Sequence, residues 1–534
     1  MKSINRYTFF ALALTLLSTM AFAQQESSLQ SIERKKMESL WFSATDNAAG
    51  AQLDQMGYYS QLGINYNQEK GNFKHTQLGE NNTGYGFATD GGGVMSNLKG
   101  TFLWGYFDYS REKVRDAAFN SSLIDPLRGT PFYIADQNLS NWVNQSYKLG
   151  MKGATPLLGR HWIIGMGLDY ENAQGAKQMD PRPNVLMSKF TVTPSLVFKA
   201  GKHALGANFQ YYSRREDGLA ANSVSINPQP VWEVVAPGFF NTGEIGSGTL
   251  SGLRDYNANS LGGGVQYSFA GESLTLLLAA KYAFAVEDVN NNYTQPKIIG
   301  STKESIWDLS ANLKWNINAG NALLAKAQYY DRNLDGIEYV QVWDSSHEVA
   351  QWVVISKSIR SNFSTKQLNL NLDYMNFDGG NAYRWLVGVD ANYEKLANIY
   401  YLPLSQQQVE NIYLKANAKR NFAFGKNMIL VGVNGGLKNN LGSMHTYTGN
   451  NADSKIYTDM VLRDYYFLKN NAFSLGGELS YTRHGILGNN SSLFVAASFD
   501  YTEAINAAVW SDKANPAHAF SNRSALLIKA GLTF

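Results

Sequence analysis

The sequence predicts an all-β fold, a transmembrane antiparallel up-and-down β-barrel of about eighteen strands, with sixteen to eighteen as the expected range. Three observations predict it: an export signal at the N-terminus, many short segments that alternate apolar and polar side chains, and an apolar last strand that ends on phenylalanine. After the signal, no apolar run approaches the length of a membrane-spanning helix. A location in the membrane therefore requires a barrel.

The first 23 residues have the features of a secretory signal. Lys2 and Arg6 precede the apolar run FFALALTLLSTM, and an A-x-A pattern ends at Ala23. The apolar stretch is shorter than the roughly 20 residues that a membrane helix needs. We therefore interpret residues 1–23 as a signal peptide cleaved after Ala23. The chain has no cysteine, so we expect neither a thiol-linked lipid nor a disulfide.

Residues 24–56 do not alternate, and we predict an N-terminal segment that is periplasmic or fills the lumen. Ser27 and Gln30 have the spacing of a helix capping box. The apolar face of the short helix that would follow contains Leu29, Ile32, Met37, Leu40 and Trp41.

The helical stretch is followed by Asn47, Ala48, Ala49 and Gly50. At this point the chain resembles the long-chain fatty-acid transporter family, whose N-terminal segment folds into the barrel as a hatch with an Asn-Pro-Ala motif. Ala48 stands where that family has proline, and the predicted strand number exceeds that family's. The resemblance covers some thirty residues and implies a lumen segment near Asn47. A lumen-filling segment of another role and a periplasmic tail are the alternatives.

Residues 57–534 form the predicted barrel. In WIIGMGLDYE, for example, Trp162, Ile164 and Met166 share one face, whereas Gly165, Gly167 and Asp169 share the other. A soluble β-sandwich also alternates, but it would not repeat the pattern some eighteen times without a domain break. Short links alternate with long stretches, as periplasmic turns alternate with extracellular loops. This arrangement requires an even strand number and places both termini in the periplasm.

Aromatic residues gather near the predicted strand ends, where the rings of a membrane barrel form two girdles at the lipid interfaces. The residues beside short turns are Phe198, Phe269, Trp315, Phe377 and Tyr383, and those beside long loops are Tyr170, Tyr211, Tyr329, Tyr393 and Tyr501.

In the last strand, Leu526, Ile528, Ala530, Leu532 and Phe534 share one face. This strand resembles the terminal strand of outer-membrane proteins, in which a final phenylalanine is read by the barrel-assembly machinery. The resemblance implies that Phe534 is an assembly signal, and that the partners of the chain include this machinery and outer-membrane lipid.

The charges exclude some classes of function. The chain has 46 Lys and Arg against 43 Asp and Glu, so nothing indicates nucleic-acid binding. The predicted lumen face mixes both signs, for example Lys189 and Lys281 with Glu171 and Asp390. This mixture favours pairing inside a narrow or plugged barrel over a strongly ion-selective pore.

Two predicted loops are rich in aromatic residues. Trp232 lies in PVWEVVAPGFF, and Trp343 and Trp352 lie in VQVWDSSHEVAQWVV, which alternates and is consistent with a hairpin standing above the membrane. Exposed aromatic rings can bind sugars or a partner protein. They can equally pack on one another as the core of a loop.

No catalytic or metal site emerges from the sequence. Among seven histidines, only His347 has candidate partners nearby in a loop, namely Asp344, Ser345 and Ser346. Adjacency in sequence does not give the geometry of a triad, and the histidines lack metal-ligand spacing. We therefore expect no enzymatic activity, no metal and no cofactor.

Two functional hypotheses remain. The chain resembles uncharacterised outer-membrane barrel proteins of Gram-negative bacteria, and the 33 residues between signal and barrel cannot supply the globular plug of a TonB-dependent receptor. The first hypothesis is passage or uptake of a solute across the outer membrane. The second is a non-enzymatic binding or assembly partner of another outer-membrane transporter or of a surface lipoprotein, acting through the aromatic loops. An open lumen would favour the first and a blocked lumen the second.

Overall fold

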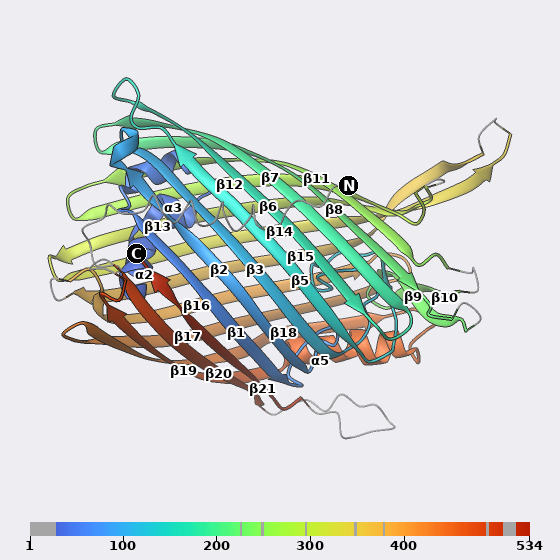
Figure 1. Cartoon of the computed structure of the whole chain (residues 1–534). Coiled ribbons are helices and arrows are strands. Elements are labelled where there is room, and N and C mark those ends of the chain that lie inside the picture. Colours follow the sequence, from blue (N-terminus) through green and yellow to red (C-terminus); the bar gives the residue numbers. More distant parts are fainter. Residues whose placement is uncertain are drawn as a thin grey trace.

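The computed structural model describes residues 28–224, 227–246, 250–293, 296–346, 350–377, 380–487, 491–505 and 520–534. The predicted signal peptide lies outside these ranges. The described strands form one antiparallel sheet of 18 strands and a small sheet of 3 strands (Figure 1). In the large sheet each strand pairs with its neighbours along the chain, and β1 pairs with β21 to close the barrel. The predicted fold class is confirmed.

The strands of the barrel are β1 Tyr59–Gly71, β2 Asn81–Met95, β3 Thr101–Ala117, β5 Ser140–Ala154, β6 Trp162–Lys177, β7 Arg182–Ala200, β8 His203–Ala221, β11 Leu253–Ala270, β12 Leu274–Asn290, β13 Ile298–Asn318, β14 Asn321–Asp344, β15 Gln351–Phe377, β16 Tyr383–Tyr400, β17 Ser405–Phe424, β18 Asn427–Tyr447, β19 Asn471–His484, β20 Ser492–Ile505 and β21 Asn522–Thr533. The small sheet contains β4 Tyr133–Ala135, β9 Gln229–Ala236 and β10 Phe239–Ile245. The helices are α2 Leu29–Glu38, α3 Leu40–Ala44, α4 Ala48–Ala51, η1 Gln52–Asp54, η2 Ser96–Leu98, η3 Ile456–Leu462 and α5 Arg463–Lys469.

The alternation along each strand separates a lumen face from a lipid face. In β6, Ile163 is 1% exposed and the next residue, Ile164, is 53% exposed. Outward apolar side chains such as Leu205, Val265 and Leu475 are also more than half exposed, on strands around the barrel. So large an apolar surface needs lipid around it. The protein is an outer-membrane barrel.

The two ends of the barrel differ. Short turns and the C-terminus share one end, the predicted periplasmic end, and the longer loops share the other, the predicted extracellular end (Figure 1). At the periplasmic end Ser60 and Phe534 exchange two backbone hydrogen bonds, of 3.1 and 2.8 Å, across the seam between β1 and the C-terminus. Among the described residues no helix is long and apolar enough to cross a membrane.

The prediction that Phe377 and Tyr383 belong to the periplasmic girdle is wrong. Tyr383 is 1% exposed, and Phe377 packs beside it in a cluster inside the barrel. The pairing of β15 with β16 shifts register between Asn376 and Phe377. The extra residue, Arg384, breaks the alternation of β16 and turns Tyr383 toward the lumen, whereas Phe377 continues the inward row of Asp373 and Met375 on β15. Trp315, by contrast, is 43% exposed on the outer surface.

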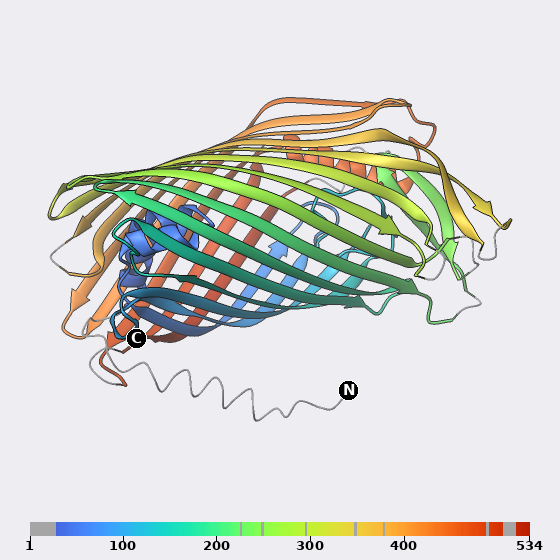
Figure 2. The same cartoon turned by 90° about the horizontal axis from the view of Figure 1, so that it is seen from above.

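Chain segments fill both ends of the lumen (Figure 2). We call residues 28–56 the plug; its helices α2, α3, α4 and η1 lie inside the periplasmic end. We call residues 118–139, 222–224, 227–246, 250–252 and 448–470 the cap; they contain the small sheet, η3 and α5 at the extracellular end. The cap has an apolar core of its own, which includes Phe119, Phe132, Val234, Tyr457 and Met460.

Candidate functional site

The four residues that the sequence singled out in the plug are buried against the barrel wall. Asn47 forms the N-cap of α4, where its side-chain oxygen accepts a hydrogen bond of 2.9 Å from the Gly50 amide. Its side-chain nitrogen donates to Gln266 on β11 at 2.8 Å. The amide of Ala49 donates to Ser195 on β7 at 3.0 Å. These bonds join the start of α4 to two wall strands.

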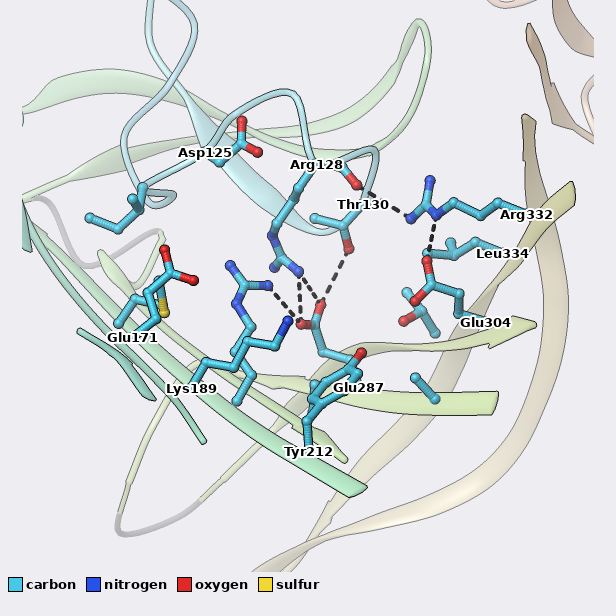
Figure 3. Close-up of a pocket in the computed structure, with 16 residues that line it drawn as sticks. Asp125, Arg128, Thr130, Glu171, Lys189, Tyr212, Glu287, Glu304, Arg332 and Leu334 are labelled. Atoms are coloured by element: carbon cyan, nitrogen blue, oxygen red, sulfur yellow. Dashed lines mark hydrogen bonds and ion pairs between the residues drawn. The ribbon is translucent and has the colours of Figure 1, made fainter. Parts of the chain in front are cut away.

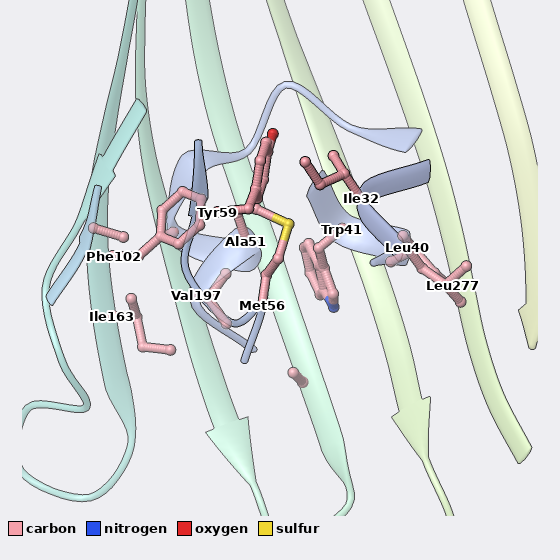
Figure 4. Close-up of a cluster of buried hydrophobic side chains, with 13 residues drawn as sticks. Ile32, Leu40, Trp41, Ala51, Met56, Tyr59, Phe102, Ile163, Val197 and Leu277 are labelled. Carbon is pink, nitrogen blue, oxygen red and sulfur yellow. The ribbon is translucent and has the colours of Figure 1, made fainter. Parts of the chain in front are cut away.

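Glycines in the wall allow α4 to approach this closely. A Cβ atom at Gly165 on β6 would lie 2.3 Å from the Ala49 nitrogen, and one at Gly206 on β8 would lie 2.8 Å from the Asn47 side chain. Glycine in a strand often marks such a close approach of another backbone. Around this contact the plug packs an apolar cluster that contains Ile32, Leu40 and Trp41 (Figure 4).

The capping box of α2 begins one residue later than the sequence predicted. The Ser28 hydroxyl accepts from the Ser31 amide at 3.1 Å, and the Ser31 hydroxyl accepts from the Ser28 amide at 2.8 Å. Gln30, one member of the predicted pair, instead donates to Ser480 on β19 at 2.8 Å.

Polar contacts attach the plug around the rest of the barrel. Four ion pairs join it to β2, β12, β13 and β17: Lys36–Asp90 at 2.7 Å, Asp46–Lys281 at 2.6 Å, Glu38–Lys314 at 2.6 Å and Glu33–Lys419 at 2.9 Å. Burial alone would raise the pKa of Asp46, but the Lys281 ammonium outweighs it and lowers this pKa. Asp46 therefore stays ionised at neutral pH.

A short segment of the cap crosses the lumen. We call residues 125–131 the strap. Arg128 of the strap pairs with Glu287 on β12 at 2.8 Å and lies 3.7 Å from Glu216 on β8. On its other side, Arg332 on β14 donates to the strap carbonyl of Gly129 at 3.2 Å. The strap is thus fixed to three wall strands by charged groups.

Below the strap lies a charged cavity, the upper cavity, of about 320 Å³ (Figure 3). A second polar cavity of about 350 Å³, the lower cavity, extends to Asp46 of the plug. The two share the lining residues Lys189, Tyr212, Ala285 and Glu304. Polar space therefore continues from the strap to the plug.

A third cavity of about 280 Å³ lies on another side of the strap and shares only Thr130 and Arg332 with the upper cavity. Its lining is more apolar and includes Phe363, Leu396 and Met460. The strap therefore separates a partly apolar space from a charged one.

The three loop tryptophans occupy different places. Trp232 on β9 is partly buried in the core of the cap, where its ring stacks on Phe119 with centroids 6.2 Å apart. Trp343 and Trp352 face each other across the tip of the β14–β15 hairpin, with centroids 5.4 Å apart. This hairpin projects beyond the cap (Figure 1).

His347 lies outside the described residues, so the loop cluster around it stays a prediction. Within the ranges that the structure describes, no group of three or more His, Asp or Glu side chains could hold a metal ion.

Sequence reasoning missed the strap. Arg128 lies in a loop with no periodicity, so nothing indicated that it reaches across the lumen. Glu216, Glu287 and Arg332 lie in strands, and the alternation of those strands was the signal that could have placed them on the lumen face.

Comparisons with solved structures give weak likenesses to outer-membrane proteins. They include BauA, the ferric preacinetobactin receptor of Acinetobacter baumannii, with 8% identity, a TM-score of 0.40, and coverage of 90% of this chain and 80% of that one. The FrpB iron transporter of Neisseria meningitidis gives 11% identity, a TM-score of 0.38, and coverage of 89% and 81%. Because these TM-scores are below 0.5, the likenesses carry no inference about activity. No curated protein sequence matches this chain.

One sequence family does match, over residues 48–534, and its description is a family of unknown function, DUF6850. The match begins at Ala48, the first residue of α4 in the plug, and runs through the last barrel strand. It gives no support to the resemblance to fatty-acid transporters. Since the match covers most of the chain, this protein belongs to the family DUF6850.

Proposed function

We propose that this barrel takes up a small polar solute across the outer membrane, and that the plug is the closure that must move to release it. The polar space from the strap to the plug, formed by the upper and lower cavities, carries the proposal. The strap and the plug both line this space with a charged side chain, Arg128 in the strap and Asp46 in the plug. A lining of this kind suits a hydrophilic solute and does not suit an aliphatic chain.

The attachment of the plug supports movement. The side chains of its four ion pairs with the wall are 16–45% exposed, and pairs that are open to water contribute only about 0 to 1 kcal/mol each. A blocked lumen alone would favour a binding role, but ion pairs, side-chain hydrogen bonds and the apolar cluster around Trp41 hold the plug, not strand pairing, so its displacement would leave the barrel sheet intact. The 18 strands are paired to one another, and the plug adds a backbone hydrogen bond of 3.1 Å from the Val94 amide of β2 to the Met56 carbonyl.

The test is a comparison of the full mature chain with a variant that lacks residues 28–56, both reconstituted in planar bilayers and in liposomes. We expect stable conductance and faster uptake of small polar solutes only for the deletion variant. A circular dichroism spectrum typical of strands and the heat-modifiable migration of a folded barrel serve as controls. A correctly folded deletion variant with neither conductance nor uptake would exclude transport through the lumen.

A second candidate function, a binding or assembly partner of another outer-membrane protein or surface lipoprotein, is supported by the tip of the β14–β15 hairpin. Val340 and Ile355 are 60% and 62% exposed there. Val340 follows Tyr329, a predicted girdle residue, by 11 residues, or about 36 Å along a strand. These side chains therefore stand in water well above the lipid, where exposed apolar surface favours a partner.

Purification from cells after crosslinking tests this second function. We expect a specific partner that is lost when Trp343 and Trp352 both become Ala. The control is Leu402→Ala, which alters another extracellular apolar side chain, 66% exposed. Retention of the same partner by the double variant would remove the hairpin from consideration.

A further inference from the structure

One cation of the upper cavity, Lys189, has no carboxylate within ion-pair distance, because Glu171, the acid opposite it on β6, contacts Lys148 instead. Lys189 on β7 makes no ion pair or hydrogen bond with the described residues, and its ammonium lies 4.6 Å from the centroid of the Tyr212 ring. Lys189 lines both the upper and the lower cavity. It therefore stands where the two polar spaces meet.

The other charges around it are already used. Arg128 and Arg214 pair with Glu216 and Glu287. With Lys189, this group has three cations and two carboxylates, and Figure 3 shows Lys189 and Arg128 on either side of the Glu287 carboxylate. Of these three cations, Lys189 is the one that no carboxylate contacts within ion-pair distance.

None of the remaining acids that line the upper cavity forms an ion pair with Lys189. Glu304 pairs with Arg332, and Glu171 lies 3.2 Å from Lys148. Asp125 is at the strap, away from Lys189 (Figure 3), and its side chain accepts from the Leu127 amide at 2.9 Å.

A second donor near this position lacks a partner. The Nη2 atom of Arg128 is buried and has no hydrogen-bond acceptor among the described residues. An unpaired charged donor in a confined cavity costs free energy, and this cost falls when an anion binds there. Carboxylates accept charge-assisted hydrogen bonds from both Lys and Arg.

We propose that the upper cavity is a binding site for small polar solutes with one carboxylate, which pairs with Lys189 and accepts from Arg128. The inference rests on the proposed function, because it names the class of solute that the lumen would take up. The hydroxyl-rich remainder of such a solute would meet the polar lining that includes Tyr212 and Thr302.

Titration calorimetry on the full mature chain in detergent tests the site, with gluconate and sorbitol as probes. Both have a six-carbon hydroxylated chain, and only gluconate has a carboxylate. We expect gluconate to bind at least tenfold more tightly than sorbitol. Lys189→Gln should lower the gluconate affinity roughly tenfold to hundredfold, as expected for a lost hydrogen bond to a charged group. Lys189→Arg should retain most of it.

Lys326→Gln is the matched control, because Lys326 lies on the lumen side of β14 and lines neither the upper nor the lower cavity. It should leave the gluconate affinity unchanged.

Equal binding of the two probes, binding of neither, or an unchanged gluconate affinity in Lys189→Gln would overturn the anion site. Gluconate that binds through Lys189 but does not pass through the chain lacking residues 28–56 would uphold the site and exclude the proposed uptake. Suppose instead that the chain lacking residues 28–56 takes up sorbitol and gluconate at equal rates, and that the full chain does not bind gluconate preferentially. That result would uphold the proposed uptake and exclude the anion site.

Discussion

The plug and the cap close two ends of one lumen, but different contacts hold them in place. In the plug, the Asp46 and Lys281 side chains that form an ion pair are 45% and 31% exposed. In the cap, Asp136 pairs with Lys177 of β6 at 2.5 Å, and these side chains are 0% and 1% exposed. Breaking a buried pair leaves an unpaired charge inside the protein, whereas breaking an exposed pair exposes both charges to water. On the proposed function, the cap is therefore the fixed framework and the plug the closure that moves.

The largest expected effect tests the fixed side of this comparison. Asp136→Ala leaves the Lys177 ammonium buried without its partner, and the loss of one member of a buried pair costs about 3 to 5 kcal/mol. Urea unfolding in detergent micelles measures the free energy of unfolding. The matched change in the plug, Asp46→Ala, should cost less than about 1 kcal/mol. Equal losses in the two variants would remove the distinction between plug and cap.

A smaller effect is expected where the plug touches the wall. Gly165→Ala places a methyl group 2.3 Å from the Ala49 nitrogen, so α4 must shift, at a cost of about 1 to 3 kcal/mol. Faster protease cleavage within residues 28–56 and more frequent channel opening are the readouts. Gly167→Ala is the control, because the nearest atom there, on Thr193, is 3.6 Å away. The same cleavage rate in both variants would mean that α4 does not depend on this close contact.

These contacts also mark the limit of what the sequence could predict. The period of two along each strand was enough to assign the faces of β6 and the number of strands. It could not reveal why Gly165 and Gly206 are glycines, because that depends on a helix from another part of the chain. Tyr383 was misplaced for the same reason: its hydroxyl donates to Glu33 of the plug at 2.6 Å, and nothing in the local sequence indicates this contact.

The candidate site was even less predictable. Lys189 was expected on the lumen face among charges of both signs, but alternation does not say which charges pair. The lone ammonium of Lys189 appears only when Arg128, a loop residue, is placed across the lumen beside Glu287. Loop conformations depend on tertiary contacts such as these and leave no periodic pattern in the sequence.

The smallest expected effect is the change with pH in how firmly the plug docks inside the barrel. Asp54 ends η1 of the plug, where its carboxyl group accepts from the amides of Trp41 and Phe42 at 3.2 and 2.7 Å. Burial raises the pKa of Asp54 from 3.8 to about 7. A released plug would return this group to water and to its ordinary pKa. The docked plug therefore binds one more proton than the released plug between about pH 4 and pH 7.

Docking should accordingly weaken as pH rises through this window and then stay constant above about pH 7. Glu38 and Asp46 of the plug keep their charges in this range, because Lys314 and Lys281 lower their pKa values below the ordinary ones. Channel opening measured in planar bilayers at pH 5, 6, 7 and 8 should increase up to pH 7 and level off. Asp54→Asn, which keeps an acceptor oxygen but does not titrate, should open to the same extent throughout. If channel opening in this variant still depends on pH, a titratable group other than Asp54 controls the docking of the plug. The groups to test next would be the ion pairs between the plug and the barrel wall.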